Sequence, residues 1–390
     1  MRSLQLDLIQ YQSYLLGEMS KMSQLKVENI SDLEAFIDGC TFFGVGGGGN
    51  PVEGFNVLKE ALDEKGPIEW KDVDEINDNN TALCTFLMGS SAPMTEEKQY
   101  VMQSLGLTQK KYPQNLINAV LEWENYIGKK VNIIVPIEIG GSNMPFPMAV
   151  AKKLDKIIVD GDYAGRAIPE IFQTTLMLED VPFTPGVSVD KFGNVCIIKE
   201  VVNISLAERL GKYLSAVVFG STGLAGFPVT GKQLKRLLIR GTISKTYEIG
   251  KIIKSARDKK TNLLEEFKKF NGKLLFNGKV IKKKIIPDEC YYKGSHTLAG
   301  INEFKGNQLK IFFKNENHIA WKDEKYLVSS PDLICCIEPN IFKPMRNAEI
   351  EIGTHLEVYA FPCPPILKEP KILKWLNPKY FGFNLEYIPI

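Results

Sequence analysis

The spacing of apolar residues in this 390-residue chain changes near residue 270, and that change constrains the fold more than any other feature. Upstream, short apolar runs at residues 131–137 and 156–159 alternate with segments of helical periodicity, such as residues 113–126 and 146–154. Short buried strands separated by helices are typical of an α/β fold in which a mostly parallel sheet is sandwiched by helices. We predict such a sheet for the first part of the chain.

Downstream of residue 270 the apolar runs are separated by Gly, Asn, Asp and Pro. They include residues 309–313, 333–337 and 356–361, and no helix of normal length fits between them. This spacing predicts a smaller all-β, barrel-like domain.

The length exceeds the roughly 250–300 residues at which a single hydrophobic core stops growing, so we expect two domains. We place the α/β sandwich domain at residues 23–270 and the β-rich domain at residues 271–390. Residues 1–22 are polar and irregular, which predicts a loosely ordered N-terminal extension.

Local patterns inside the first domain give further expectations. A helix that begins after Asn29 is expected to stop at Gly39, since glycine ends helices readily. Residues 216–219 are expected to form a strand, and residues 244–269 to form one long helix.

Composition and charge argue against several classes of partner. The net charge is +2 and no stretch approaches 18 uninterrupted apolar residues, so we expect neither nucleic acid nor a membrane as partner. Asp7 and Gln10 interrupt the N-terminal apolar residues, which does not fit a secretory signal and leads us to expect a cytoplasmic protein. Residues 251–284 carry twelve Lys or Arg against three acids, a pattern of either a nucleic-acid stripe or a solvated helix face, and we favour the solvated face.

Cysteines and histidines carry little functional signal. The seven cysteines are widely spaced, which is typical of reduced, mostly buried thiols, and the neighbours Cys335 and Cys336 are expected on opposite faces of a strand. His296, His318 and His355 do not have the spacing of a zinc site.

The glycine tract at residues 44–49 matches the letters of a dinucleotide-binding loop. It lacks the required context, because a helix precedes it, Asn50-Pro51 follows it, and no Walker-type Lys-Ser/Thr ends it. We expect no nucleotide. Successive glycines permit a tight turn or a close approach to a ligand, so Gly46, Gly47, Gly48 and Asn50 become candidate substrate-binding residues, with a bare structural turn as the alternative.

Acidic residues follow two neighbouring strands of the predicted sheet. Glu138 comes directly after the first strand, and Asp160 and Asp162 follow the second. Ligands bind outside the carboxyl ends of strands in open α/β sheets, so these three carboxylates are candidate catalytic residues or ligands of a divalent metal. The alternative is structural, with Asp162 as a helix cap.

Other polar residues of these loops extend the candidate site. Arg166 could neutralise the carboxylates or hold an anionic substrate group, and the alternative is that it pairs with Glu170. Asn143 and Glu170 are candidate substrate-binding residues. Glu316 lies in a late polar loop that could reach the site or form a hairpin turn.

Several segments in this order together resemble the S-methyl thiohydantoin desulfurase-like family, over about residues 30–390. They include the glycine tract with Asn50-Pro51, Val135-Pro-Ile-Glu-Ile-Gly-Gly141, Val159-Asp-Gly-Asp-Tyr-Ala-Gly-Arg166-Ala-Ile-Pro-Glu170, Gly241-Thr-Ile-Ser244, Lys314-Asn-Glu-Asn317, Ser330-Pro-Asp-Leu-Ile334 and Pro378-Lys-Tyr-Phe-Gly382. The resemblance implies an α/β sandwich followed by a barrel-like domain. It also implies a hydrolase that replaces sulfur on the ring carbon of a five-membered cyclic thiohydantoin, releasing a thiol and leaving a hydantoin.

The chain departs from the family pattern at a few positions. Asn50 stands where relatives usually carry an acid, and Tyr163-Ala164 replaces a methionine-containing pair. His318 and His355 stand where relatives tend to be apolar.

The expected reaction is attack of water on the ring carbon, with Asp160 or Asp162 as general base. The glycine-tract amides and Arg166 would stabilise the developing charge. A divalent metal held by Glu138, Asp160 and Asp162 is the other route to activated water. Two further functions stay open. One is a cyclic amide or imide hydrolase that acts with a hydantoinase- or oxoprolinase-type partner, and the other is a non-catalytic ligand-binding protein. A homo-oligomer stays open as well.

Overall fold

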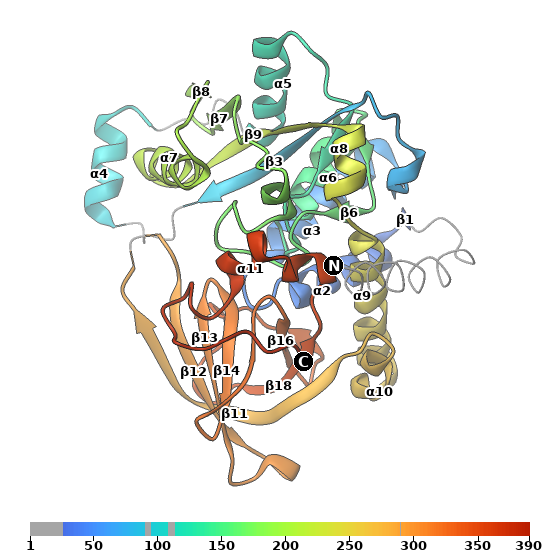
Figure 1. The fold of residues 1–390 in the computed structure, drawn as a ribbon, viewed down its shortest axis with the longest axis vertical. Helices are drawn as coiled ribbons and strands as arrows, with labels where there is room; N and C mark the ends of the chain where they lie inside the picture. Colours follow the sequence, from blue (N-terminus) through green and yellow to red (C-terminus); the bar gives the residue numbers. More distant parts are fainter. Residues whose placement is uncertain (1–25, 90–94, 108–113, 289) are drawn as a thin grey trace.

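The computed structural model describes residues 26–89, 95–107, 114–288 and 290–390. The expected extension at residues 1–22 lies outside the described residues. Figure 1 shows a helix-rich part in the upper half of the view and a large β-sheet in the lower half, with helix α11 (Pro370–Leu376) back at the junction between them.

A six-stranded sheet organises the first part, in the order β5-β4-β3-β9-β7-β8. Its strands are β3 (Thr81–Gly89), β4 (Ile133–Val135), β5 (Ile157–Ile158), β7 (Gly186–Asp190), β8 (Val195–Ile198) and β9 (Ser221–Thr230). Only the pairs β3–β4 and β4–β5 are parallel, whereas β3–β9, β7–β9 and β7–β8 are antiparallel. The sheet is therefore mixed and not mostly parallel, because β7 and β8 form a hairpin and β9, which follows α7, runs antiparallel to both of its neighbours.

Helices cover both faces of this sheet, as the sequence predicts. Helices α5 (Asn115–Ile127) and α6 (Pro145–Lys153) pack on one face, and α7 (Ile204–Val217) and α8 (Gly231–Leu237) pack on the other. Side chains of β3 alternate between the two cores, with Leu83 in one and Ala82 and Cys84 in the other. The strand expected at residues 216–219 is wrong, because α7 extends to Val217 with the small residues Gly211 and Ser215 facing inward.

Helices α2 (Ile30–Phe43) and α9 (Thr242–Lys259) cross closely, which overturns the expected helix end at Gly39. A Cβ at Gly39 would lie 1.9 Å from the Thr246 carbonyl oxygen, and one at Gly250 would lie 1.7 Å from that of Ala35. The glycines therefore serve the crossing and do not end the helix. The long helix expected at residues 244–269 is interrupted at Lys260, and α10 (Leu263–Lys268) follows.

The second part is one eight-stranded antiparallel sheet, in the order β15-β14-β13-β12-β11-β18-β16-β17. Its strands are β11 (Lys273–Ile286), β12 (Lys293–Gly300), β13 (Gln308–Lys314), β14 (Glu316–Lys322), β15 (Lys325–Ser329), β16 (Leu333–Glu338), β17 (Lys343–Pro344) and β18 (His355–Phe361). The expected all-β domain is confirmed, but the pairings of the described strands leave β15 and β17 as two ends, so it is an open sheet and not a closed barrel.

Shorter elements complete the fold. They are α3 (Pro51–Lys65), α4 (Glu96–Ser104), β1 (Lys26–Val27) paired with β2 (Ile68–Glu69), and β6 (Gly161–Asp162) paired with β10 (Ile239–Arg240). Among the helices of the described ranges, none combines the length and apolarity that a membrane crossing requires.

Aromatic side chains join the two parts. Phe42 of α2 lies 5.1 Å from Phe267 and 5.7 Å from Phe361, measured between ring centroids. Cys335 belongs to this shared core and Cys336 to the core of the β part, which confirms that the two thiols point to opposite faces. Aromatic burial of this kind fixes the parts against each other, since each ring removes a large apolar area from water.

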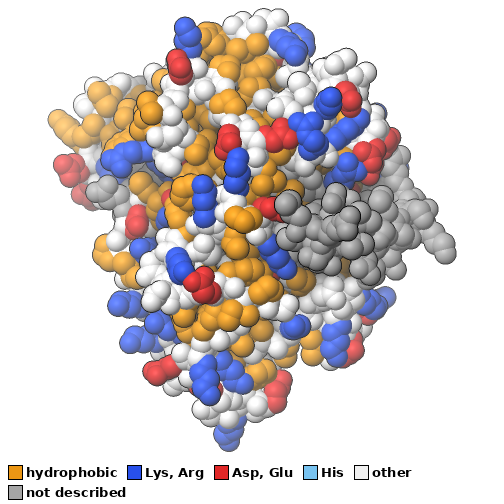
Figure 2. All heavy atoms as spheres, viewed as in Figure 1, with side chains coloured by type: hydrophobic (Ala, Val, Ile, Leu, Met, Phe, Trp, Pro, Cys, Tyr) orange, Lys and Arg blue, Asp and Glu red, His pale blue; other side chains and the backbone are white. Residues whose placement is uncertain are grey.

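The surface carries interspersed charge. On the face drawn in Figure 2, basic and acidic side chains are scattered among apolar ones. Within the basic run at residues 251–284, Lys254, Arg257 and Lys283 pair with carboxylates of other elements, as do Lys268 and Lys269 with neighbours on α10.

Candidate functional site

A cavity of about 450 Å³ lies where the two parts meet, and both contribute to its walls. The glycine tract, the end of β3, the loop after β4 and α7 line it from the first part, and the start of β14 lines it from the second. Eight of the residues predicted from sequence line this cavity, namely Gly46, Gly47, Gly48, Asn50, Glu138, Asn143, Glu170 and Glu316.

The glycine tract brings the two parts into backbone contact. A Cβ at Gly47 would lie 2.0 Å from Oε1 of Glu316, and one at Gly48 would lie 2.5 Å from Cα of Gly140. Gly48 also has a φ of 77°, which side-chain-bearing residues rarely adopt. Asn50 ends the tract and caps α3 by accepting a hydrogen bond from the Val52 amide at 3.0 Å. The tract therefore lets a carboxylate of the β part approach the loop after β4.

Glu138 lies in that loop and is almost fully buried. Its Oε1 accepts from Nδ2 of Asn143 at 2.5 Å, and its Oε2 accepts from the Ile168 amide at 2.5 Å. Burial raises the pKa of Glu138 well above its ordinary value, and the neighbouring carboxylate of Glu316 raises it further. Glu138 is thus held in a fixed orientation and favours the protonated form.

Glu316 is the first residue of β14 and is buried as well. Burial raises its pKa to about 7, while the Arg166 guanidinium and the Gly48 amide oppose that rise. Its Oε2 has no hydrogen-bond partner among the described residues. A carboxyl that titrates near neutral pH and keeps one oxygen unpaired in a cavity can exchange a proton with a bound molecule.

Asp160 and Asp162 do not line the cavity. The chain leaves the edge strand β5 and turns into β6, which pairs with β10 and places both carboxylates against the start of α9. Asp160 accepts from the Ser244 amide at 3.0 Å and from its hydroxyl at 2.5 Å. Oδ2 of Asp162 accepts from the amides of Ala164 and Gly165. Burial raises the pKa of Asp160 to about 6 and that of Asp162 to about 7. Both positions argue for structural and against catalytic roles.

Arg166 is also away from the cavity surface, with no exposed area. Its guanidinium donates to four backbone carbonyls, those of Ala167, Asn317, Pro331 and Asp332. Three of these belong to the β part, so Arg166 joins the two parts. The alternative that Arg166 pairs with Glu170 is not realised, because Glu170 accepts from Lys314 and Tyr380.

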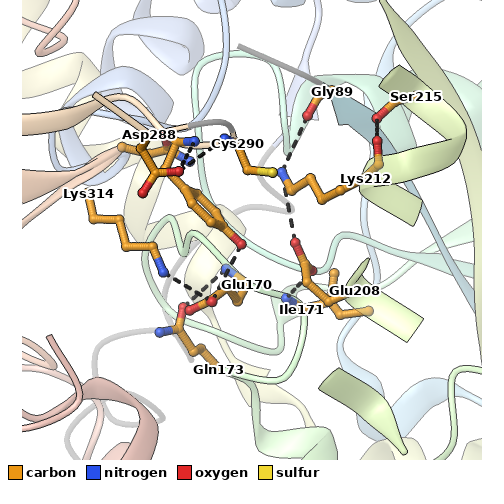
Figure 3. Close-up of polar contacts among 12 residues, drawn as sticks. Gly89, Glu170, Ile171, Gln173, Glu208, Lys212, Ser215, Asp288, Cys290 and Lys314 are labelled. Carbon is orange, nitrogen blue, oxygen red and sulfur yellow. Dashed lines mark hydrogen bonds and ion pairs between the residues drawn. The ribbon is translucent and has the colours of Figure 1, made fainter. Parts of the chain in front are cut away.

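Glu170 also lines the cavity and belongs to a cluster of charged side chains, shown in Figure 3. Its Oε1 accepts from Lys314 Nζ at 3.0 Å, and its Oε2 accepts from the Tyr380 hydroxyl at 2.7 Å. Glu208 and Lys212 of α7 line the cavity beside it. The sequence analysis missed both of these residues.

The local helix pattern gave no signal for Glu208 and Lys212. Leu206 and Leu210 of α7 are 37% exposed, whereas Glu208 is 5% exposed. The helix thus turns apolar residues outward and an acid inward, the reverse of ordinary amphipathicity. Conflicts between local pattern and fold are expected at functional sites.

The metal site suggested by the sequence is not assembled from the predicted residues. Within the described ranges, no group of three or more His, Cys, Asp or Glu side chains is arranged to hold a metal ion. The imidazole rings of His296 and His318 are buried against Phe313 and Phe381, respectively.

The fold and site define a two-part α/β and β protein with an acidic cavity at the junction of its parts. Models of the S-Me-THD-like N-terminal and C-terminal domains match residues 31–200 and 202–390. The chain therefore belongs to the S-methyl thiohydantoin desulfurase-like family, which confirms the resemblance seen in its sequence.

A solved structure shares the fold. It is an X-ray crystal structure of a structural-genomics protein from Chromobacterium violaceum, with a TM-score of 0.73 and 22% identity, covering 94% of this chain and 100% of that one. No curated protein matches the chain.

Proposed function

We propose that this protein is a hydrolase that acts on a small five-membered thiohydantoin- or hydantoin-like ring, with Glu138 and Glu316 as its acid–base pair. Family membership supports the substrate class. The observation that supports the acid–base roles is that two buried carboxyls, whose charges act on each other, line one cavity. Two interacting carboxyls separate their pKa values, so that one stays protonated while the other is ready to accept a proton.

The steps use both carboxyls. Glu316 accepts a proton from water as the C–O bond forms at the sulfur-bearing ring carbon, and Glu138 donates its proton to the adjacent ring nitrogen. The C–S bond then breaks, the new hydroxyl returns a proton to Glu138, and the thiolate leaves with the proton held by Glu316. Water thus supplies the oxygen of the hydantoin and the hydrogens of the thiol and of the ring N–H.

The test is thiol release from a panel of S-methylated thiohydantoins by the purified protein. We expect Glu316→Gln and Glu138→Gln each to lower kcat by about 10²–10⁴-fold, the usual cost of losing an acid–base group. Glu338→Gln, outside the cavity, is the matched control and keeps its rate.

Other outcomes would reassign the function. Ring opening without thiol release would favour the cyclic amide or imide hydrolase, and binding without turnover would favour a ligand-binding protein. Undiminished thiol release by both glutamine variants would disprove the roles of the pair.

A further inference from the structure

Two side chains of α7 line the cavity. Glu208 and Lys212 lie one helical turn apart, so both project from the same face of the helix. Figure 3 shows them beside Gly89 and Ile171, with the Glu170 cluster next to them. Neither residue takes part in the acid–base steps proposed above.

The neighbouring charges already have close partners. Both oxygens of Glu170 accept hydrogen bonds, from Lys314 and Tyr380, and the Tyr291 hydroxyl adds a longer contact at 3.4 Å. The Lys314 ammonium also lies 4.0 Å from the centre of the Tyr291 ring. The hydrogen-bonding capacity of Glu170 and Lys314 is therefore used within the protein.

One oxygen of Glu208 accepts no hydrogen bond within the described residues. Its Oε2 accepts from the Ile171 amide at 3.0 Å, which fixes the carboxylate in place. Its Oε1 is buried and has no hydrogen-bond partner among the described residues. A buried acceptor without a hydrogen bond is unfavourable, so its position in a cavity wall points to a donor on a bound molecule.

Lys212 supplies a donor next to that acceptor. Its Nζ lies 3.8 Å from Oε1 of Glu208 and 3.4 Å from the carbonyl oxygen of Gly89. Both distances exceed the roughly 2.7–3.2 Å of a good hydrogen bond. The Lys212 side chain is only 14% exposed and its ammonium lies 5.2 Å from the centre of the Tyr291 ring, so a bound molecule in the cavity could offer it a closer hydrogen-bond acceptor than the protein does.

We propose that Glu208 and Lys212 together bind the amide edge of the ring. A ring N–H donates to Oε1 of Glu208, and the adjacent ring carbonyl accepts from Nζ of Lys212. The pair offers one acceptor and one donor with no net charge, which suits a neutral –CO–NH– edge, whereas Glu208 would repel a carboxylate. This inference rests on the proposed function, since it orients the same ring between the two walls of one cavity.

The test measures binding of hydantoin and its two N-methyl derivatives by calorimetry, with no turnover required. We expect wild-type protein to bind hydantoin, and to bind one of the methyl derivatives about 10–100-fold more weakly, the effect of losing a hydrogen bond to a charged group. Glu208→Gln should weaken hydantoin binding by a similar factor. Its amide oxygen would stay on the Ile171 N–H and its NH₂ group would face the ligand N–H.

The coupling between ligand and variant decides the question. In Glu208→Gln the N-methyl derivative should lose no further affinity, and Lys212→Met should weaken all three ligands alike. Glu200→Gln, an exposed acid, is the control, and melting temperatures show that each variant folds. Lys212→Met keeps the test decisive if Glu208→Gln does not fold.

Three results would overturn the inference. They are no binding of hydantoin to the wild type, equal binding of both methyl derivatives and hydantoin, and unchanged hydantoin affinity in the variants. Binding that follows the predicted pattern without any thiol release would support the inference and reject the proposed function. Thiol release that is unchanged in the Glu208 and Lys212 variants would support the proposed function and reject the inference.

Discussion

Gly47 shows how one residue without a side chain shapes the site. A Cβ there would lie 2.0 Å from Oε1 of Glu316 and 2.7 Å from its carboxyl carbon, closer than non-bonded atoms approach. The Glu316 carboxyl, which belongs to the β part, thus occupies the space that a side chain at Gly47 of the first part would fill. A polar group held in this way needs both parts to be correctly packed.

We predict that Gly47→Ala lowers kcat by about 10²-fold, because it displaces the Glu316 carboxyl by an ångström or more. Thiol release measures the effect, and the pH profile of kcat should shift as well, because the pKa of Glu316 depends on its burial. Gly220→Ala is the control, since its new Cβ would meet nothing closer than 3.7 Å. Normal activity of Gly47→Ala would mean that Glu316 moves without consequence and is not part of the reaction.

Individual residues were predicted with unequal success. The positions of Glu138 and Glu316 in one cavity follow from the strand-end rule and from the late polar loop, both visible in the sequence. Asp160 follows a strand as well, but β5 is the edge of the sheet, and the chain after it turns toward α9. That turn depends on long-range pairing of β6 with β10, which no local pattern reports.

At the scale of elements, the start of α9 depends on Asp160. The residue before α9, Gly241, has no side chain to accept from the first amides of the helix, and the Asp160 carboxylate accepts from the Ser244 amide instead. The Ser244 hydroxyl also accepts from Nε1 of Trp70 at 2.9 Å, so the cap extends into a buried network. Helix N-termini favour such a negative group.

We predict that Asp160→Ala destabilises the protein by about 1–2 kcal/mol, the usual cost of losing a helix cap, while kcat stays within about threefold. Urea unfolding and thiol release give the two numbers. Asn29→Ala, at the exposed cap of α2, serves as a matched control with a smaller loss. Loss of turnover in a folded, stable Asp160→Ala protein would restore the catalytic role that the sequence suggested.

Helix boundaries were predictable only where local chemistry decides them. The helix expected after Asn29 begins at Ile30, and the Asn29 side chain caps it by accepting from the Asp32 amide. Gly39 looks like a helix end but lies in the close crossing with α9, where Thr246 and Gly250 are its neighbours. Gly39 and Gly250 are far apart in the sequence, and no local pattern indicates that they lie together, so the helix crossing could not be predicted.

At the scale of the whole molecule, the junction of the two parts concentrates buried ionisable groups. Burial raises the pKa values of Asp162 and Glu316 to about 7, and it raises that of Glu138 further above its ordinary range. Burial also lowers the pKa of His296 to about 4 and that of His318 well below its ordinary value. Folding therefore strengthens proton binding by the carboxyls and weakens proton binding by the histidines.

Because of these raised carboxyl pKa values, we predict that the free energy of unfolding falls as pH rises from 6.5 to 8. The folded carboxyls keep protons that the unfolded chain has released by about pH 4 to 5, so their contribution is present at low pH and is lost as pH rises through about 7. The two histidines affect stability only below their unfolded pKa of about 6.5, where they reduce stability as pH falls, so they do not change stability between pH 6.5 and 8.

We expect urea unfolding to give a free energy of unfolding about 1–3 kcal/mol lower at pH 8 than at pH 6.5, at roughly 1.4 kcal/mol for each proton and pH unit. Glu316→Gln should flatten this dependence, whereas Glu338→Gln should not. Stability that is constant or rises over the window would show that the cavity carboxyls are ionised in the folded protein, and would remove the basis for treating Glu138 as the acid.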